Sequence, residues 1–317
     1  MDFETAGVAA QKTQLTDITY KITTRSDTAD LVRSIAEVGL LQPPVVIGHA
    51  DGPYRVVSGF RRIAACQALN LASFPARILP ADTPPMACVR IAISDNAFQR
   101  PLNLVEQSRA YALIRRFSDP TIESWGPLAA SVGLPDSRTA MDRITPLAGM
   151  PQDLQAAVLE GSVALPVALR INQYETADGA ALCSLLRRLS TNLNLQRELL
   201  TLISEIALRD EIGVATLIAG NDIAAHMGDT GGSVPQKVQA LRRMLKRKRY
   251  PQLSKAEADY DQALQSLHLN PRLRLQPPPF FEGSSYRLTL TVSSRRQLQA
   301  LQSDLQKLIE HPDLLPE

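Results

Sequence analysis

The sequence has only three cysteines and no long apolar run, and both shortages exclude classes of protein. Cys66, Cys88 and Cys183 stand far apart, without a Cys-x-x-Cys pair or a nearby histidine. Neither a disulfide framework nor a zinc site is therefore predicted, and a reducing compartment is indicated. No segment reaches the roughly 18 apolar residues of a membrane span, and the N-terminus lacks the pattern of a signal peptide. We expect a soluble cytoplasmic protein without membrane contact.

Charge of one sign is not in excess either, because 34 lysine and arginine residues are balanced by 32 aspartate and glutamate residues. The net charge of +2 gives no argument for or against nucleic acid, so local clusters have to decide that question. Hydrophobic residues at 44% and charged residues at 21% are ordinary for a folded protein. A length of 317 residues predicts two or three folded units.

Apolar periodicity and turn residues predict a multidomain α+β protein. Helix and strand signals alternate in the first part of the chain. Helical periodicity alone follows, and Asn103 with Glu106 resembles a capping box at its start. A glycine-rich segment over 220–235 is typical of a loop or linker. The predicted parts are a flexible tail over 1–22, a small α/β domain over 23–101, an all-α domain over 102–220, a linker and basic helix over 221–250, and a helix-strand-strand-helix domain over 251–317.

Within the α/β domain, the patterns predict two helices and three strands. The predicted helices are 29–38 and 61–69, and the predicted strands are 44–47, 54–57 and 74–79. Asp51, Gly52 and Pro53 form the predicted turn between the first two strands.

The segment from residue 125 to 144 shows the pattern of a helix-turn-helix, a DNA-binding motif. Leu128 and Val132 belong to the buried face of a first helix, and Gly133 permits the turn. Ser137 can cap a second helix, whose exposed residues would meet phosphates and base edges in the major groove. A plain helical hairpin is the alternative. The residues predicted to contact DNA are Ser137, Arg138, Thr139 and Arg143.

A second cluster of positive charge follows in KVQALRRMLKRKRY, residues 237–250. On a helix its apolar residues form one stripe, opposite the basic residues. This density predicts salt-dependent binding to DNA phosphates without reading of sequence. The alternative is a solvated linker helix. The basic residues assigned to DNA are Lys246, Arg247, Lys248 and Arg249.

The last predicted helix has leucines at spacings of three, four and three. Such a seam is typical of a short two-helix association, which predicts that this part of the chain forms a homodimer. The alternative is that the leucines pack on their own two strands, because so short a seam falls below the usual coiled-coil criterion. The leucines are Leu298, Leu301, Leu305 and Leu308.

A phosphate-binding pattern lies where the second predicted strand runs into a helix. The segment VVSGFRRIAA places Ser58 and Gly59 before Arg61 and Arg62. A glycine at a helix start lets backbone amides approach a phosphate, and the arginines can neutralise its charge. Two arginines at a helix start are, on their own, also typical of plain surface charge.

Three successive segments resemble the boxes of the ParB N-terminal domain: GLLQPPVV at 39–46, VVSGFRRIAACQALN at 56–70 and DNAFQRPLNLVEQ at 95–107. The helix-turn-helix and the C-terminal pattern are similar to the later domains of the ParB/RepB family of partition proteins. The resemblance implies a homodimer that binds CTP with Mg2+ and closes as a clamp on DNA around a palindromic site. It also implies plasmid or chromosome partition and a nucleoid-associated location, with a Walker-type ATPase as a further candidate partner.

Carried over by position, the resemblance implies eight nucleotide-binding residues: Gln42, Ser58, Gly59, Arg61, Arg62, Asn96, Gln99 and Arg100. The chain departs from the family pattern at Phe60, where an acidic residue is usual. In the third box, Asn96 and Ala97 occupy the acidic and amide positions, unless a one-residue insertion places Asp95 and Asn96 there as Mg2+ ligands. We therefore expect CTP binding with weak or absent hydrolysis.

Two other functions are consistent with these residues. One is a transcriptional regulator with a helix-turn-helix and a degenerate nucleotide pocket. The other is a nucleotide-dependent phosphotransferase, because related domains occur in sulfiredoxin and in some serine kinases. Phe60 removes a carboxylate that a kinase needs. Cys66 lies beyond the place of the sulfiredoxin cysteine, and we predict that it is a small buried residue.

Overall fold

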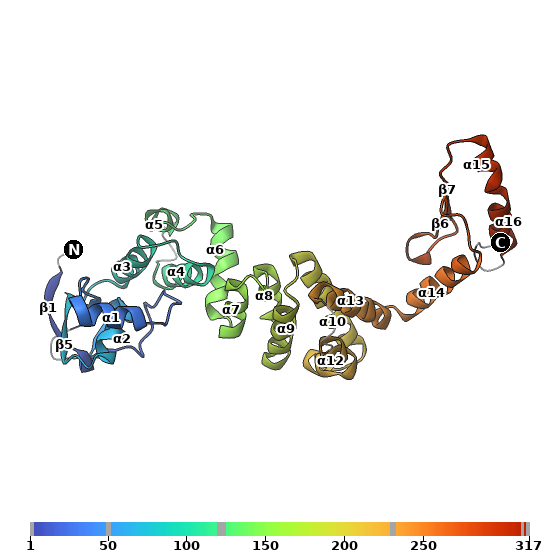
Figure 1. Ribbon diagram of the computed structural model, residues 1–317. Helices are drawn as coiled ribbons and strands as arrows, with labels where there is room; N and C mark the ends of the chain where they lie inside the picture. Colours follow the sequence, from blue (N-terminus) through green and yellow to red (C-terminus); the bar gives the residue numbers. More distant parts are fainter. Residues whose placement is uncertain (1–2, 49–51, 119–124, 229–232, 312–313, 315–317) are drawn as a thin grey trace. The chain divides into compact units, whose positions relative to one another are not determined.

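The computed structural model describes residues 3–48, 52–118, 125–228, 233–311 and 314, and Figure 1 shows its elements along the chain. Backbone contacts divide it into two units, Met1–Tyr174 and Glu175–Glu317. The division falls inside the helical part predicted over 102–220. Asp51 of the predicted turn and residues 229–232 of the predicted linker lie outside the described residues.

The first unit contains a mixed five-stranded sheet. Its strands are β1 (Glu4–Ala9), β2 (Thr13–Gln14), β3 (Val45–Ile47), β4 (Tyr54–Ser58) and β5 (Ser73–Leu79), in the order β1-β5-β3-β4-β2. β3 runs parallel to β5 and antiparallel to β4. The three strands predicted from apolar runs are therefore confirmed, and they form the centre of the sheet.

The N-terminal residues are part of this sheet, so the predicted flexible tail is wrong for residues 4–14. β1 pairs with β5 in antiparallel fashion along its whole length. Val8 and Ala10 are buried in the core beneath it. The segment is short and mostly polar, and its order comes from pairing with a strand far along the chain. Local periodicity does not report such a partner.

Helices cover both faces of the sheet. They are α1 (Ala29–Val38) and α2 (Phe60–Ala68) on one face, and α3 (Pro85–Ala97) and α4 (Leu104–Phe117) on the other. Val46 and Val56 lie in the first core, whereas Val45 and Val57 lie in the second, as the alternation of side chains along a strand requires. This arrangement brings the ends of β4 and α3 together, which positions the site described below.

Two helices joined by a turn lie where the helix-turn-helix, or a plain helical hairpin, was predicted. Its helices are α5 (Trp125–Ser131) and α6 (Arg138–Ile144). Gly133 adopts a φ of +74° in the turn, a conformation that favours glycine. The Ser137 hydroxyl caps α6 by accepting from the Ala140 amide at 3.4 Å. Leu128, Val132 and Met141 are buried in the same core as α3 and α4, so the motif is anchored on the α/β part of this unit. The helices that follow in this unit are α7 (Gln152–Leu159) and α8 (Leu165–Ile171).

The second unit begins with helices only. They are α9 (Thr176–Leu189), α10 (Leu193–Arg209), α11 (Val214–Ala219), α12 (Asn221–Gly228) and α13 (Val234–Arg249). The glycine-rich segment predicted as a loop over 220–235 is thus helical over most of its described residues. The reason is Ile223, which is buried beside Leu217 of α11 and Leu245 of α13. Within the parts that the structure describes, no helix has the length and apolar character needed to cross a bilayer.

The C-terminal part has the predicted helix-strand-strand-helix order. Its elements are α14 (Pro251–Ser266), β6 (Leu273–Gln276), β7 (Arg287–Leu290), α15 (Arg295–Ala300) and α16 (Gln302–Glu310). Leu301 and Leu308 are 1% and 3% exposed in a core with Tyr260 and Leu273, and Leu305 packs against that core. An intermolecular seam through Leu301 and Leu308 is therefore wrong, since both are covered within the unit. Leu298, 46% exposed, is the member that faces outward.

A buried carboxylate connects the start of α4 to the segment before α1. Glu106 is fully buried, and its two oxygens accept from Arg100 at 2.6 and 2.7 Å. It also accepts from the amides of Thr24 and Asn103, while the Asn103 side chain accepts from the Glu106 amide. The predicted capping box is thus confirmed. Burial alone would raise the pKa of Glu106, but the Arg100 and amide hydrogen bonds lower it to about 2.

This pKa predicts an acid-sensitive contribution to the stability of the first unit. Because the folded-state pKa lies below the usual 4.5, the contribution is complete above that pH and is lost as the pH falls toward 2. We expect Glu106→Gln to lower the free energy of unfolding at pH 7 by about 2 kcal/mol, once solvent screening is allowed for. Urea unfolding followed by circular dichroism at a series of pH values measures this contribution.

Glu37→Gln is the matched control, because Glu37 is exposed on α1 and is not among the residues that contact Glu106. An equal acid dependence in the wild type and the Glu106→Gln variant would contradict the assignment.

Candidate functional site

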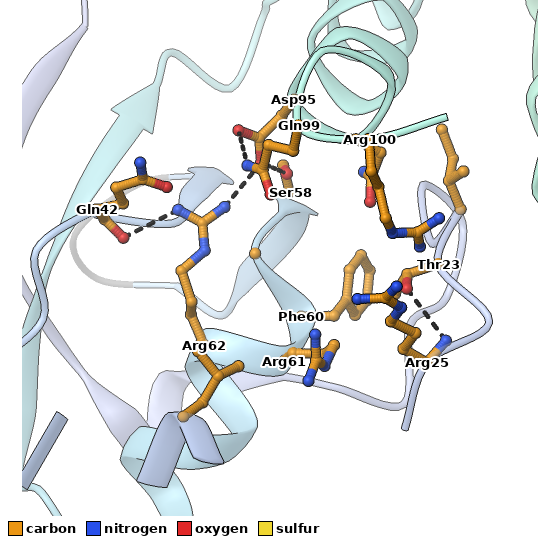
Figure 2. Close-up of a pocket in the computed structure, with 14 residues that line it drawn as sticks. Thr23, Arg25, Gln42, Ser58, Phe60, Arg61, Arg62, Asp95, Gln99 and Arg100 are labelled. Carbon is orange, nitrogen blue, oxygen red and sulfur yellow. Dashed lines mark hydrogen bonds and ion pairs between the residues drawn. The ribbon is translucent and has the colours of Figure 1, made fainter. Parts of the chain in front are cut away.

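A cavity of about 450 Å³ lies in the first unit, where β4 runs into α2 and α3 ends. Figure 2 shows how the side chains of these elements converge on it. All eight residues predicted for nucleotide binding line this one cavity: Gln42, Ser58, Gly59, Arg61, Arg62, Asn96, Gln99 and Arg100. Segments far apart in the sequence are therefore brought together as the three boxes suggested.

Gly59 makes the turn from β4 into α2. Its φ of +92° lies in the left-handed region, which favours glycine. A Cβ atom at this position would lie 2.6 Å from Cβ of Pro44 and 2.9 Å from its Cα. The backbone therefore passes too close to Pro44 for any side chain, and the start of α2 is left open toward the cavity.

Asp95 is the acidic residue among those that line the cavity, and three side chains contact it. Arg62 Nη2 forms an ion pair with Asp95 Oδ2 at 2.7 Å, and the Ser58 hydroxyl donates to the same oxygen. Gln99 Nε2 donates to the other oxygen, Oδ1, at 3.3 Å. Arg62 also donates from Nη1 to the Gln42 carbonyl at 2.9 Å, so its guanidinium is fixed at two ends.

The geometry bears on the two alignments of the third box. Asp95 contacts Ser58 and Arg62, whereas the Asn96 amide donates at 2.8 Å to the Ala92 carbonyl of its own helix. Asp95 is thus the residue that presents a carboxylate to the cavity, and Asn96 lines the cavity as well. Phe60 is 7% exposed and belongs to the core. Position 60 therefore offers no carboxylate to the cavity.

Positive charge dominates the cavity, because its lining residues include four arginines but a single carboxylate, that of Asp95. Arg61 donates to the Asp27 carbonyl at 3.0 Å, which is a neutral acceptor. Arg100 is engaged with buried Glu106. The charge on Arg25 and Arg61 is consequently available to an anion such as a phosphate.

Thr23 and Arg25 line the cavity and were missed by the sequence analysis. They belong to an irregular segment before α1, placed there by hydrogen bonds from Thr24 to Glu106. Nothing in the local sequence indicates this position, because the contact depends on a residue far along the chain.

The cysteines do not supply a reactive thiol to this site. Cys66 and Cys88 are fully buried, and burial raises the pKa of both thiols. Cys66 is thus the small buried residue that was predicted. Among the described residues there is also no cluster of three or more His, Cys, Asp or Glu side chains that could hold a metal by itself.

The second helix of the helix-turn-helix presents its polar residues outward. Arg138, Thr139 and Arg143 are exposed on α6. Neither arginine forms an ion pair with another residue in the described ranges. Ser137 is exposed as well, but its hydroxyl is already used as the helix cap. The arginines of α6 are therefore free to meet an external partner.

The basic helix α13 differs from the prediction. Lys246, Lys248 and Arg249 form ion pairs with acidic residues of α10 and α12, at distances of 3.1, 3.4 and 2.8 Å. The partners are Glu198, Asp222 and Glu205. Of the four residues assigned to DNA, Arg247 is exposed without an ion pair to a described residue. Most of this charge is therefore paired within its own unit, which neither the DNA-binding prediction nor the alternative of a solvated linker helix described.

The fold and site define an α+β protein whose first unit combines an arginine-lined pocket with the helix pair α5 and α6. Residues 9–97 match the family model of the ParB N-terminal domain. The predicted resemblance to ParB proteins is thereby confirmed.

Similar proteins include the chromosome-partitioning protein ParB of Caulobacter vibrioides, 30% identical over 139 residues and 43% of each chain. The nucleoid occlusion protein of Listeria innocua is 30% identical over 163 residues, which cover 51% of this chain and 54% of that protein. The chain thus matches about half the length of these curated relatives.

Solved structures of a C-terminally truncated ParB from Caulobacter crescentus are also similar. The complex with CTP-gamma-S is 27% identical with a TM-score of 0.27, and covers 58% of this chain and 98% of that chain. The complex with the centromeric parS site is 21% identical with a TM-score of 0.33, and covers 60% of this chain and 96% of that chain.

The packing at Gly59 predicts a strong effect of substitution. Gly59→Ala adds a left-handed strain and a clash with Pro44, and we expect it to lower the free energy of unfolding by about 2 to 4 kcal/mol. Gly7→Ala is the control, since a Cβ on Gly7 meets nothing within 4 Å. Urea unfolding followed by circular dichroism measures both variants. Equal stability of the two would show that Pro44 moves aside freely.

Proposed function

We propose that this chain is a ParB-type DNA-binding protein that binds CTP in the arginine-lined cavity and acts in partition of a chromosome or plasmid. The observation that supports the proposal most directly is the convergence of eight residues from three separate sequence boxes on one cavity of about 450 Å³. A dimer, a cytoplasmic nucleoid-associated location and a partner ATPase belong to the same proposal.

In this proposal the triphosphate binds at the start of α2. The open backbone at Gly59 lets phosphate oxygens approach the first amides of the helix. Arg61 and Arg62 come from the first turn of that helix, and Arg25 approaches from the segment opposite. To reach a phosphate, Arg62 has to exchange its ion pair with Asp95 for one with the ligand. The pair is partly exposed, at 15% and 31% for the two side chains, so the exchange costs little.

Magnesium would be held mainly by the phosphates. It prefers oxygen ligands and is often bound by one or two carboxylates together with substrate phosphates. The cavity offers the carboxylate of Asp95, with the hydroxyl of Ser58 beside it. Asp95, once released from Arg62, is therefore the residue that would bind the metal in this proposal. Turnover of CTP would then depend on Asp95, because Phe60 cannot contribute a carboxylate.

A test of the pocket separates phosphate binding from metal binding. Calorimetry with CTP should show binding to the wild type and none to Arg62→Ala. Asp95→Asn frees Arg62 and should raise CTP affinity without Mg2+ by up to about tenfold, while removing the gain that Mg2+ gives to the wild type. A phosphate-release assay on Asp95→Asn should show slower turnover.

Arg90→Ala is the matched control for these variants, because Arg90 is exposed on α3 and does not line the cavity. If CTP does not bind the wild type, the proposed function of this domain is wrong.

DNA recognition is assigned to α6. An arginine can donate two hydrogen bonds to a guanine in the major groove, and each lost base contact costs about 1 to 3 kcal/mol. We expect Arg138→Ala with Arg143→Ala to lose sequence preference in a genome-wide pull-down, and Arg170→Ala, an exposed arginine on α8, to keep it. Unchanged binding sites in the double variant would contradict the assignment.

Phe60 favours a second candidate, a transcriptional regulator that uses the same helix-turn-helix without nucleotide turnover. The two differ in one observable. A partition clamp should close on DNA when CTP is added, so that crosslinking between two copies increases, whereas the regulator should bind its DNA site equally with and without CTP.

A further inference from the structure

A second and wider cavity of about 790 Å³ lies in the first unit and is not used by the proposed function. It is a groove with three walls: α4, α7 and the segment over residues 18–26. Two of the walls are helices that present matching faces. At positions i, i+3, i+4 and i+7, α4 contributes Arg109, Ala112, Leu113 and Arg116, and α7 contributes Gln152, Gln155, Ala156 and Leu159.

The groove carries two exposed apolar side chains among its lining residues. Ile18 is 62% exposed and Leu159 is 40% exposed, whereas Leu113 and Met150, at 7% and 4%, are already covered within their own unit. Apolar side chains exposed in a concave surface are typical of sites that bind another protein. Two helices with a channel between them are also the form that receives an amphipathic helix.

The charge of the groove has one sign. Lys21, Arg25, Arg109 and Arg116 line it, and no acidic residue is among its lining residues. None of the four forms an ion pair within the described part of the chain. This contrasts with α13, where acidic residues of the same unit pair with most of the basic side chains.

Arg109 fixes the floor of the groove without losing its charge. Its Nη1 donates to the Thr23 carbonyl at 2.9 Å and its Nη2 donates to Gln155 Oε1 at 3.4 Å. Both acceptors are neutral. Gln155 in turn donates to the Met150 carbonyl at 2.8 Å, so α4, α7 and the 18–26 segment are joined by one chain of hydrogen bonds. The groove is therefore a built feature of the unit, with positive charge directed along it.

We propose that this groove binds an acidic amphipathic helix of a partner protein. The apolar face of that helix would cover Ile18 and Leu159, and its acidic residues would meet Lys21 and Arg116 at the rim. Duplex DNA fits less well, because a phosphate backbone gives no partner to the exposed apolar side chains and leaves them in water.

The test uses the full chain and labelled probes in fluorescence anisotropy, without nucleotide. The main probe is a helical peptide of about 18 residues, roughly five turns, with leucines at i, i+3, i+4 and i+7 and glutamates beside them. Its twin has lysine at each glutamate position. We expect the acidic peptide to bind and its twin not to bind. Arg116→Glu and Ile18→Ser should each weaken binding by about five- to tenfold.

Two controls locate the effect. Arg115→Glu changes the same charge on the neighbouring exposed position of α4, which does not line the groove, and it should alter affinity by less than about twofold. Lys21→Glu combined with Arg116→Glu should shift the preference toward the basic twin. Hydrogen exchange should show protection of α4 and α7 by the acidic peptide.

The proposal is overturned if the acidic peptide does not bind, if both peptides bind equally, or if a DNA duplex protects α4 and α7 while the peptide does not. Because the assay contains no CTP and leaves Arg138 and Arg143 unchanged, these outcomes are independent of the proposed nucleotide pocket and DNA-reading helix.

Discussion

The buried carboxylate of Glu106 connects three parts of the first unit that are far apart in the sequence. It caps α4, accepts two hydrogen bonds from Arg100 and holds the backbone of Thr24. A buried charge that loses its partners is costly, so each partner has to stay in place. The segment held at Thr24 lines the arginine-rich cavity on one side and the groove along α4 on the other. The shape of both cavities therefore depends on one ion pair.

This dependence separates the arginines of the pocket by role. The pair of Arg100 with Glu106 has one member fully buried, so breaking it would leave an uncompensated charge in the core. The pair of Arg62 with Asp95 has no fully buried member, so an incoming phosphate can replace the carboxylate without leaving a charge in the core. We infer that Arg62 acts on a ligand whereas Arg100 holds the wall of the cavity, although both belong to motifs of the same family resemblance.

The sequence predicted what local pattern and chemistry determine. Gly59 at a strand-to-helix turn, the Asn103 capping box and the turn at Gly133 are set by residues within a few positions of one another, and the structure contains all three. The predictions that failed depend on distant partners. β1 is ordered by pairing with β5, and Leu301 is buried against Tyr260 and Leu273. Asp95 was predicted as a pocket residue only in the alignment with a one-residue insertion. Local pattern does not tell which side chain of that short box reaches Ser58 and Arg62.

Positive charge shows the same difference between local density and three-dimensional context. By sequence, α13 is the most basic segment of the chain, yet Glu198 and Glu205 of α10 neutralise much of it across the helix interface. The cations of α6, of the arginine-lined cavity and of the groove are more scattered along the sequence. Few acidic side chains lie within reach of them in the described structure, so their field is directed outward. The proposed ligand sites for that reason all lie in the first unit. A run of basic residues in a sequence predicts a binding surface only where the fold leaves it unpaired.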